Sequence, residues 1–122
     1  MGQILLIHSI AIDETGGSHG VRDNGVILSL EQVPKQIIFG KELYPTVFDK
    51  AAVYARNIIR QHPFIDGNKR VGMAAAGVFL ENNGYFLDVE NGQIEKMALK
   101  IAIKRLEAKA IASWLRKHSK KI

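Results

Sequence analysis

Apolar side chains recur along most of this chain at the three- to four-residue spacing of an α-helix. The clearest segment covers residues 47–61, where the apolar positions share one face. Thr46 precedes this segment and Asp49 follows three residues later, so a capping box predicts where the helix begins. Residues 68–82 are apolar nearly all round, and we expect them to form a buried central helix.

Shorter patterns predict the remaining elements. Three further apolar segments predict helices, at residues 3–12, 92–105 and 107–118. Ser29 and Gln32 have the spacing of a capping box and predict another short helix after residue 29. Residues 38–45 are interrupted by glycine and proline, which favours a small hairpin or flap, whereas residues 85–87 are expected to be an apolar connector.

The length and composition fit one folded domain. A chain of 122 residues is long enough for one hydrophobic core but not for two. A hydrophobic content of 47% with 24% charged residues is typical of an ordinary globular protein rather than a disordered one. We therefore expect residues 1–122 to form a single all-α domain, a helical bundle around a buried central helix with at most one small β-hairpin.

Composition also excludes several classes of protein and site. The chain has no cysteine, which excludes disulfides, thiolate metal sites and a catalytic thiol. No window approaches 18 uninterrupted apolar residues, so we expect no membrane-spanning segment. The N-terminus lacks a basic region and a small-residue cleavage site, so we expect no signal peptide and a cytoplasmic protein.

Positive charge is concentrated at the C-terminal end of the chain. Residues 100–122 carry eight lysines and arginines against Glu107 alone, although the whole chain has a net charge of only +5. A basic terminal helix favours an acidic partner or nucleic acid, but a solvated helix face explains the same charges. The rest of the chain is slightly acidic, so we do not expect the body of the protein to bind nucleic acid.

The residue types that perform chemistry are concentrated in residues 62–70, His-Pro-Phe-Ile-Asp-Gly-Asn-Lys-Arg, which lead into the predicted central helix. The first amides of a helix have no intrahelical partner, and the helix dipole favours negative charge there, so the segment predicts an anion site. Gly67 lets the backbone approach a phosphate closely. Arg70 can add a forked contact to phosphate oxygens.

Two side chains add reactivity to this anion site. Asp66 suits Mg²⁺, because magnesium in phosphoryl transfer is usually held by one or two carboxylates together with the phosphates. His62 can act near neutral pH as a general base on an incoming hydroxyl. Each residue alone has a simpler explanation, since Asp-Gly-Asn-Lys is typical of a turn and Phe64 is expected to anchor the loop in the core. Their combination favours a nucleotide site.

The segment resembles the motif of the Fic/Doc superfamily, His-Pro-Phe-x-Asp/Glu-Gly-Asn-Gly-Arg-x-x-Arg. The positions that match are His62, Pro63, Phe64, Asp66, Gly67, Asn68 and Arg70. Lys69 stands where most members have the second glycine, and Met73 where they have the second arginine. Both differences follow the pattern of the death-on-curing (Doc) branch, and similarity to that branch extends over roughly residues 4–115.

This resemblance implies the Fic/Doc-type helical bundle and a transferase activity. Most members transfer AMP to a hydroxyl of a target protein. The lysine of the Doc branch implies a reversed nucleotide pose, in which the γ-phosphate of ATP is transferred in a kinase-like reaction. Family analogy gives elongation factor Tu as the protein target, whose modification blocks translation. AMP transfer and a catalytically silent binding protein stay open as alternatives.

The resemblance also implies roles for individual residues. His62 is expected to be the base, Asp66 the Mg²⁺ ligand, and Asn68, Lys69 and Arg70 the phosphate-binding groups, with the amide of Gly67 contributing. Arg22 and Asp23 either line the nucleotide pocket or form a structural ion pair. Residues 38–45 correspond to the flap that docks the backbone of the target by strand addition.

Regulation is expected to come from another protein. Some Fic proteins carry an inhibitory helix with the pattern Ser/Thr-x-x-x-Glu-Gly/Asn. Glu81 and Glu90 are each followed by asparagine, but Gly77 and Phe86 occupy the Ser/Thr positions, so the pattern is absent. In the Doc branch, inhibition comes in trans from a small antitoxin whose disordered tail folds on binding. His8 and His118 are expected to be ordinary structural or surface residues, and the role of His19 is left open.

Overall fold

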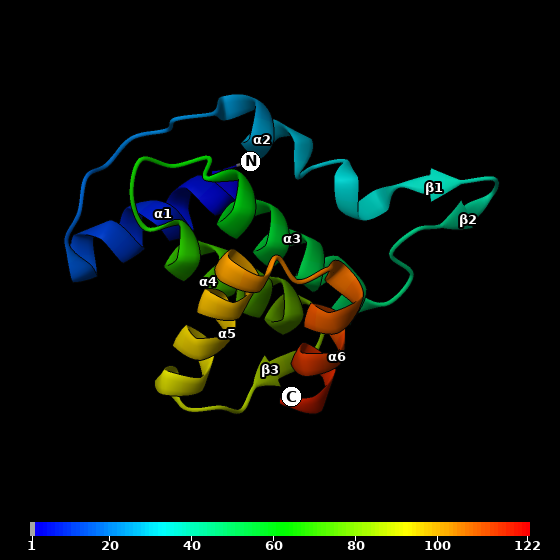
Figure 1. The fold of residues 1–122 in the computed structure, drawn as a ribbon. Coiled ribbons are helices and arrows are strands. Elements are labelled where there is room, and N and C mark those ends of the chain that lie inside the picture. Colours follow the sequence, from blue (N-terminus) through cyan, green and yellow to red (C-terminus); the bar gives the residue numbers. More distant parts are fainter. Residues whose placement is uncertain (1) are drawn as a thin grey trace.

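The computed structural model describes residues 2–122, which fold into six α-helices and two small sheets (Figure 1). The helices are α1 (Gly2–Thr15), α2 (Asn24–Ser29), α3 (Val47–Gln61), α4 (Asn68–Asn82), α5 (Asn91–Lys104) and α6 (Ala108–Lys117). A 3₁₀ turn, Val33–Lys35, follows α2. The strands are β1 (Ile37–Ile38), β2 (Lys41–Glu42), β3 (Tyr85–Leu87) and β4 (Ser119–Lys121). The all-α architecture predicted from the sequence is confirmed.

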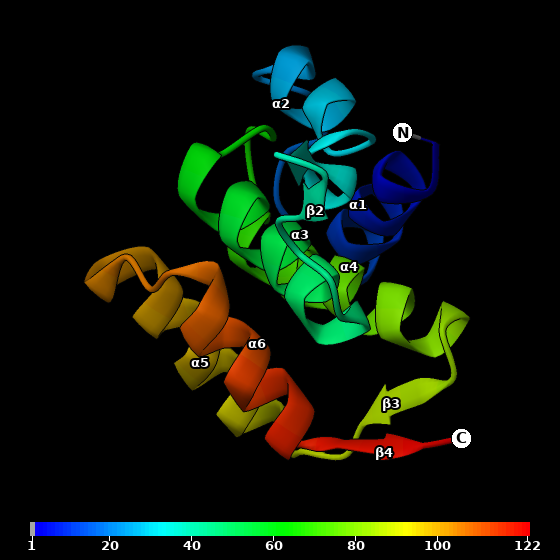
Figure 2. The ribbon, with the colours of Figure 1, turned by 90° about the vertical axis from the view of Figure 1, so that its right-hand side faces the viewer.

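Helices α3 and α4 pack against each other at the centre, with α1 and α2 on one side and α5 and α6 on the other (Figures 1 and 2). Gly72 of α4 lies where the two central helices meet. A Cβ atom at this position would lie 2.6 Å from Ile59 Cγ1 and 3.2 Å from Ala55 O. Glycine therefore allows the close approach of α3 and α4. The sequence predicts α4 alone as the central helix, whereas in the structure α3 and α4 lie at the centre together.

Two clusters of buried side chains flank this central pair. The first joins α3 and α4 to α5 and α6. The second joins them to α1 and α2, and it includes Ile4, Ile27, Leu30, Ile58, Phe64 and Val71. Phe64 belongs to the loop between α3 and α4 and is only 1% exposed. Burial of such a side chain stabilises a fold by about 1.5–3 kcal/mol, so Phe64 anchors the loop in the core, as predicted.

Several element boundaries follow local sequence signals. Thr46 Oγ1 accepts a hydrogen bond from Asp49 N at 3.0 Å, and Asp49 Oδ2 accepts one from Thr46 N at 3.1 Å. This capping box begins α3 at the predicted residue. Helices α4, α5 and α6 also lie within one residue of their predicted ends. The predicted hairpin is present as β1 and β2, which pair antiparallel with Ile37 opposite Glu42.

The capping box predicted at Ser29 is wrong. Ser29 is the last residue of α2, and its Oγ donates to Val26 O at 2.7 Å instead of opening a helix. Only the 3₁₀ turn follows, and the side chain of Gln32 does not cap it. Helix α2 itself was not predicted. It is capped by Asp23, whose Oδ1 accepts from Val26 N at 3.3 Å.

The connector predicted at residues 85–87 is also wrong. This segment is β3, and it pairs antiparallel with β4 near the C-terminus, with Tyr85 opposite Lys121 (Figure 2). The molecule therefore contains a second two-stranded sheet beyond the single hairpin expected. Within residues 2–122, no helix is long and apolar enough to cross a bilayer.

Candidate active site

The motif loop, residues 62–67, joins the end of α3 to the start of α4. Both of its ends have left-handed backbone, at His62 (φ 49°, ψ 60°) and at Gly67 (φ 80°, ψ 14°). For a residue other than glycine this conformation costs about 1–3 kcal/mol and persists only where surrounding contacts enforce it. Contacts with the rest of the fold therefore hold the backbone of His62 in this conformation.

Asn68 connects the two halves of the loop from inside. It is 7% exposed. Its Oδ1 accepts from Phe64 N at 3.0 Å, and its Nδ2 donates to Phe64 O at 2.9 Å and lies 3.4 Å from His62 Nδ1. The Asn68 side chain, predicted to bind phosphate, is thus engaged with the loop, and its backbone amide is the group that remains for an anion. The Nε2 atom of His62 has no hydrogen-bond partner within residues 2–122.

The start of α4 combines free amides with two cations. Because the helix begins at Asn68, its first amides have no intrahelical acceptor, and the helix dipole adds partial positive charge. A Cβ atom on Gly67 would lie 3.2 Å from Ile12 Cδ1, and φ of 80° disfavours any other residue. Lys69 and Arg70 are exposed at this end, and Arg70 Nη1 donates to Thr15 Oγ1 at the end of α1. These groups form a site suited to phosphate.

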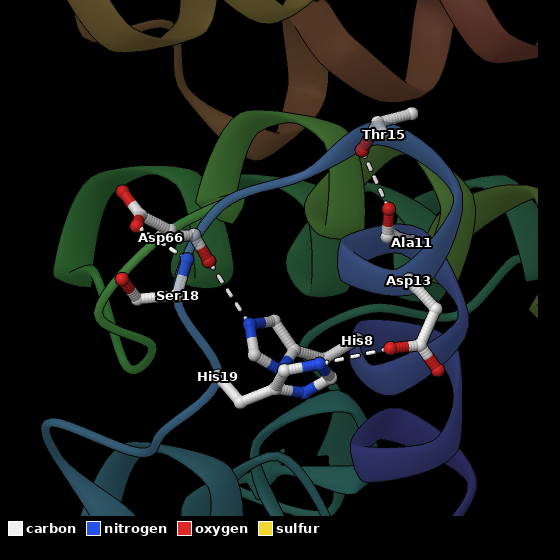
Figure 3. A network of polar contacts seen from close by, with 7 residues as sticks. All are labelled: His8, Ala11, Asp13, Thr15, Ser18, His19 and Asp66. Carbon is white, nitrogen blue, oxygen red and sulfur yellow. Dashed lines mark hydrogen bonds and ion pairs between the residues drawn. The ribbon is translucent and has the colours of Figure 1, made fainter.

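Asp66 is exposed but held from two sides (Figure 3). Its Oδ2 accepts from Ser18 N at 2.8 Å, and its backbone oxygen accepts from His8 Nε2 at 3.0 Å. In residues 2–122 no group of three or more histidine, cysteine or acidic side chains is placed to hold a metal. Mg²⁺ often takes one or two protein carboxylates and completes its coordination with substrate phosphates and water. A lone Asp66 therefore fits a magnesium ion shared with a nucleotide.

Arg22 and Asp23 contact the loop backbone and α2. Arg22 Nε donates to His62 O at 2.6 Å, and its Nη2 donates to Gln61 O. The backbone amides of Arg22 and Asp23 both donate to Pro63 O, at 2.7 and 3.0 Å. No ion pair joins the two side chains in the part of the chain described. Their structural role is backbone support, whereas a nucleotide contact from either one stays a prediction.

A groove of about 860 Å³ begins at Lys69 and Arg70 and lies between α1, α4, β3 and α5. Its apolar lining residues are Met73, Ala74, Val78, Leu87, Ile94, Ala98 and Leu99, and its acidic ones are Glu14, Glu81 and Glu95. His62 and Asp66 do not line it. The groove therefore extends from the cationic side of the motif, where it offers an apolar surface beside Lys69 and Arg70.

His8 contributes to this region in a way that the sequence did not indicate. It is 4% exposed, and its ring stacks on Phe64 with centroids 3.9 Å apart and planes 5° apart. Its contact with Asp66 spans 58 positions in the chain, so no local spacing signals it. His19, for which the sequence indicates no role, donates from Nε2 to Asp13 Oδ1 at 2.9 Å. His118 is structural, since its Nδ1 donates to Trp114 O at 2.8 Å.

The β1–β2 hairpin projects away from the helices (Figure 1). Its turn residues Phe39 and Gly40 both have positive φ, 50° and 77°, as in a type I′ turn. Phe39 is fully exposed, at 101%, and Ile37 and Ile38 are also exposed. An exposed apolar hairpin presents free strand edges to which an extended segment of another protein can add.

Two comparisons with known proteins bear on this site. Residues 1–80 match the model of the Fic/DOC family. The chain is also 34% identical, over 114 residues, to a protein of Mycolicibacterium smegmatis named Toxin Doc. That match covers 92% of this chain and 85% of the relative, so it includes the motif loop.

Proposed function

The chain belongs to the Fic/DOC family, and we propose that it is a Doc-like toxin that transfers the γ-phosphate of ATP to a hydroxyl of a protein target. By family analogy, the target is elongation factor Tu. The proposal rests on the chemical groups that the motif loop brings together. Free amides, Lys69 and Arg70 lie at its α4 end, and the free Nε2 of His62 and the oriented carboxylate of Asp66 belong to the same short loop.

The start of α4 would bind the phosphates. Phosphoryl transfer needs little covalent participation from the protein, and catalysis depends on positioning and on electrostatic stabilisation of phosphate oxygens. The amides of residues 68–70 supply directional donors, while Lys69 and Arg70 supply charge. When bound, Mg²⁺ would neutralise phosphate charge, and Asp66 is the side chain that would hold it.

His62 would act as the general base. The target hydroxyl forms a bond to the γ-phosphorus, the bond from that phosphorus to the β–γ bridging oxygen breaks, and ADP leaves. The hydroxyl proton passes to Nε2 of His62. The 3.4 Å separation between Asn68 Nδ2 and His62 Nδ1 is longer than a normal hydrogen bond. The contact with Asn68 is therefore too weak to fix which nitrogen carries the hydrogen, and Nε2 accepts the proton in the tautomer whose hydrogen is on Nδ1.

Lys69 supports phosphate transfer over AMP transfer. It occupies the position at which most Fic proteins have a glycine, so its side chain fills space beside the inner phosphates and adds a cation. Met73, in place of the second arginine, lines the groove with an apolar side chain. Both residues make the α4 end different from that of an AMP-transferring member and support the Doc-like nucleotide pose.

AMP transfer is the second candidate. The amides at the start of α4 can bind any phosphate of ATP, and the groove beside Lys69 and Arg70 is large enough for a nucleoside. The two reactions differ in which phosphorus is attacked. Incubation of the protein and its target with ATP labelled separately at the α- and γ-phosphates distinguishes them. We expect label in the target only from γ-labelled ATP, and label only from the α position would contradict the kinase-like proposal.

We also propose that a small antitoxin inhibits the enzyme in trans. The relative named Toxin Doc supports this partner, and the chain lacks the inhibitory pattern of self-regulated Fic proteins. A helical segment of an antitoxin that occupies the apolar groove would reach Lys69 and Arg70 at its end and compete with ATP. Expression of the protein without the antitoxin should arrest growth, and co-expression of the neighbouring small reading frame should relieve the arrest. Harmless expression alone would contradict the proposal.

A further inference from the structure

The segment formed by residues 16–23 runs antiparallel to the motif loop and contacts it from one end to the other. Successive contacts join Ser18 to Asp66, Gly20 to Ile65, Val21 to Phe64, and Arg22 to His62. Asp66 and His62, the two groups with proposed chemical roles, therefore lie against different parts of this segment.

We propose that the N-terminal region positions the two ends of the motif loop separately, with His8 and Ser18 orienting Asp66 and Arg22 fixing His62. This inference rests on the proposed function, because it concerns the metal ligand and the base of that site. His8, Ser18 and Arg22 are positioning residues, since each acts through a loop residue and not on a reacting atom.

At the Asp66 end, the main chain and the carboxylate are held at the same time. The stack of His8 on Phe64 sets the plane of the imidazole, so its Nε2 donates to the backbone oxygen of Asp66. Ser18 N donates to Oδ2 of the carboxylate. Oδ1 has no partner within residues 2–122 and remains available to a cation. Partners that orient a ligand in this way typically change metal affinity about 10–100-fold.

Two glycines let the 16–23 segment come this close. A Cβ atom on Gly17 would lie 3.4 Å from Asp66 Cβ, and one on Gly20 would lie 2.6 Å from Ile65 Cδ1. Both residues also have positive φ, 114° and 136°. Any other residue at these two positions would strain this backbone, so the glycines permit the path that brings the segment against the loop.

At the His62 end, Arg22 binds the last carbonyls of α3. The final carbonyls of a helix have no intrahelical donor, and the guanidinium of Arg22 bonds to those of Gln61 and His62. The fork spans two neighbouring oxygens, which a lysine cannot do with the same rigidity. The contact holds the left-handed backbone of His62, from which its imidazole projects.

The first test distinguishes loss of the contact between His8 and Asp66 from general destabilisation of the fold. His8→Phe keeps an aromatic ring against Phe64 but removes the donor to Asp66, and His8→Gln restores an amide donor. Binding of Mn²⁺ in the presence of ATP can be followed by electron paramagnetic resonance.

We expect His8→Phe to weaken Mn²⁺ binding about tenfold, within the range for such partners. His8→Gln should recover part of it, and ATP binding in EDTA should not change. Hydrogen exchange at the Ser18 amide should accelerate in His8→Phe.

The second test uses Arg22→Lys, which keeps the charge. We expect kcat of the transfer reaction to fall about tenfold, while Mn²⁺ binding with ATP and exchange at the Ser18 amide stay as in the wild type. Normal Mn²⁺ binding and normal Ser18 exchange in His8→Phe would overturn the inference. It would also be overturned if His8→Phe and Arg22→Lys altered kcat and Mn²⁺ binding in parallel.

Failure of the proposed function gives a different result. A wild-type protein that binds Mn²⁺ and ATP but transfers no label contradicts the function. In that case, Ser18 exchange and Mn²⁺ binding in His8→Phe still support or overturn the positioning of Asp66. For the His62 end, exchange of the Asp23 amide, which donates to Pro63 O at 3.0 Å beside His62, should accelerate in Arg22→Lys but not in His8→Phe. Faster exchange in His8→Phe but not in Arg22→Lys would overturn the proposed role of Arg22.

Discussion

The motif loop and the β1–β2 hairpin are both short connections next to α3, but the fold holds them in opposite ways. The loop has Phe64 in the core, the Asn68 side chain on its backbone, and the 16–23 segment along its length. The hairpin has its own strand pairing and exposes Phe39 at its tip. Chemical groups act only when held within a fraction of an ångström, whereas a surface that reads another protein's main chain needs an open edge. From this contrast we propose that the loop performs the chemistry and that the hairpin docks the protein target.

The largest effect is expected at the acidic group of the loop. Asp66→Asn keeps an oxygen for the Ser18 amide but removes the charge, so transfer should fall at least about 10²-fold, as when one electrostatic group of a reaction site is lost. Because Asp66 is exposed, the free energy of unfolding should change by less than about 0.5 kcal/mol. Asp13→Asn, another exposed carboxylate nearby, is the matched control and should leave transfer unchanged. Equal losses in both variants would contradict the assignment of Asp66.

A second variant tests whether the loop is held from inside. Asn68→Ala removes both partners of the Phe64 backbone, and each unpaired buried group costs about 1–3 kcal/mol, so the free energy of unfolding should fall by about 2–6 kcal/mol. Urea denaturation measures this change. Asn83→Ala removes an exposed amide that donates to Phe79 O at the end of α4, and it should cost less than about 0.5 kcal/mol. Similar costs for the two variants would show that the loop is not fixed by Asn68.

The hairpin should show the opposite behaviour. Phe39→Ser should leave the free energy of unfolding unchanged because the side chain is fully exposed. If Phe39 docks the target, its loss should cost about 1–2 kcal/mol of target binding, which is roughly a 5- to 30-fold rise in KM for the protein target. Binding of ATP should not change. Ile103→Ser removes another exposed apolar side chain, from α5, and is expected to leave KM unaffected. A normal KM in Phe39→Ser would remove the docking role.

The smallest expected effect is on the pH dependence of the free energy of unfolding, and it involves neither the motif loop nor the hairpin. Burial raises the pKa of Tyr54 on α3, and the charge of Glu31 raises it further. A raised pKa in the folded state means that Tyr54 contributes stability below its unfolded pKa of about 10, and that this contribution is lost as the pH rises. Tyr54→Phe should therefore show a shallower loss of stability in alkaline solution, measured by urea denaturation. Parallel curves for the two proteins would contradict this contribution.

The sequence predicted features that depend on neighbouring residues. The capping box of Thr46 and Asp49, the start of α4 after Gly67 and the anchoring of Phe64 all have local signals, and the structure contains each of them. The pairing of β3 with β4 and the contact of His8 with Asp66 were not predicted. They join segments far apart in the chain and leave no periodicity in either segment. The role of residues 16–23 as backbone support for the loop was missed for the same reason.

The most direct measurement of the central claim is growth arrest by the protein and by its His62→Ala variant, each expressed without antitoxin at equal amounts of folded protein. His62 is exposed, so its truncation should leave the fold intact, while loss of a general base typically costs about 10²–10⁴-fold in rate. The account predicts arrest by the wild type and normal growth with the variant. Arrest of equal strength by His62→Ala would contradict an enzymatic motif loop and would identify a silent binding protein.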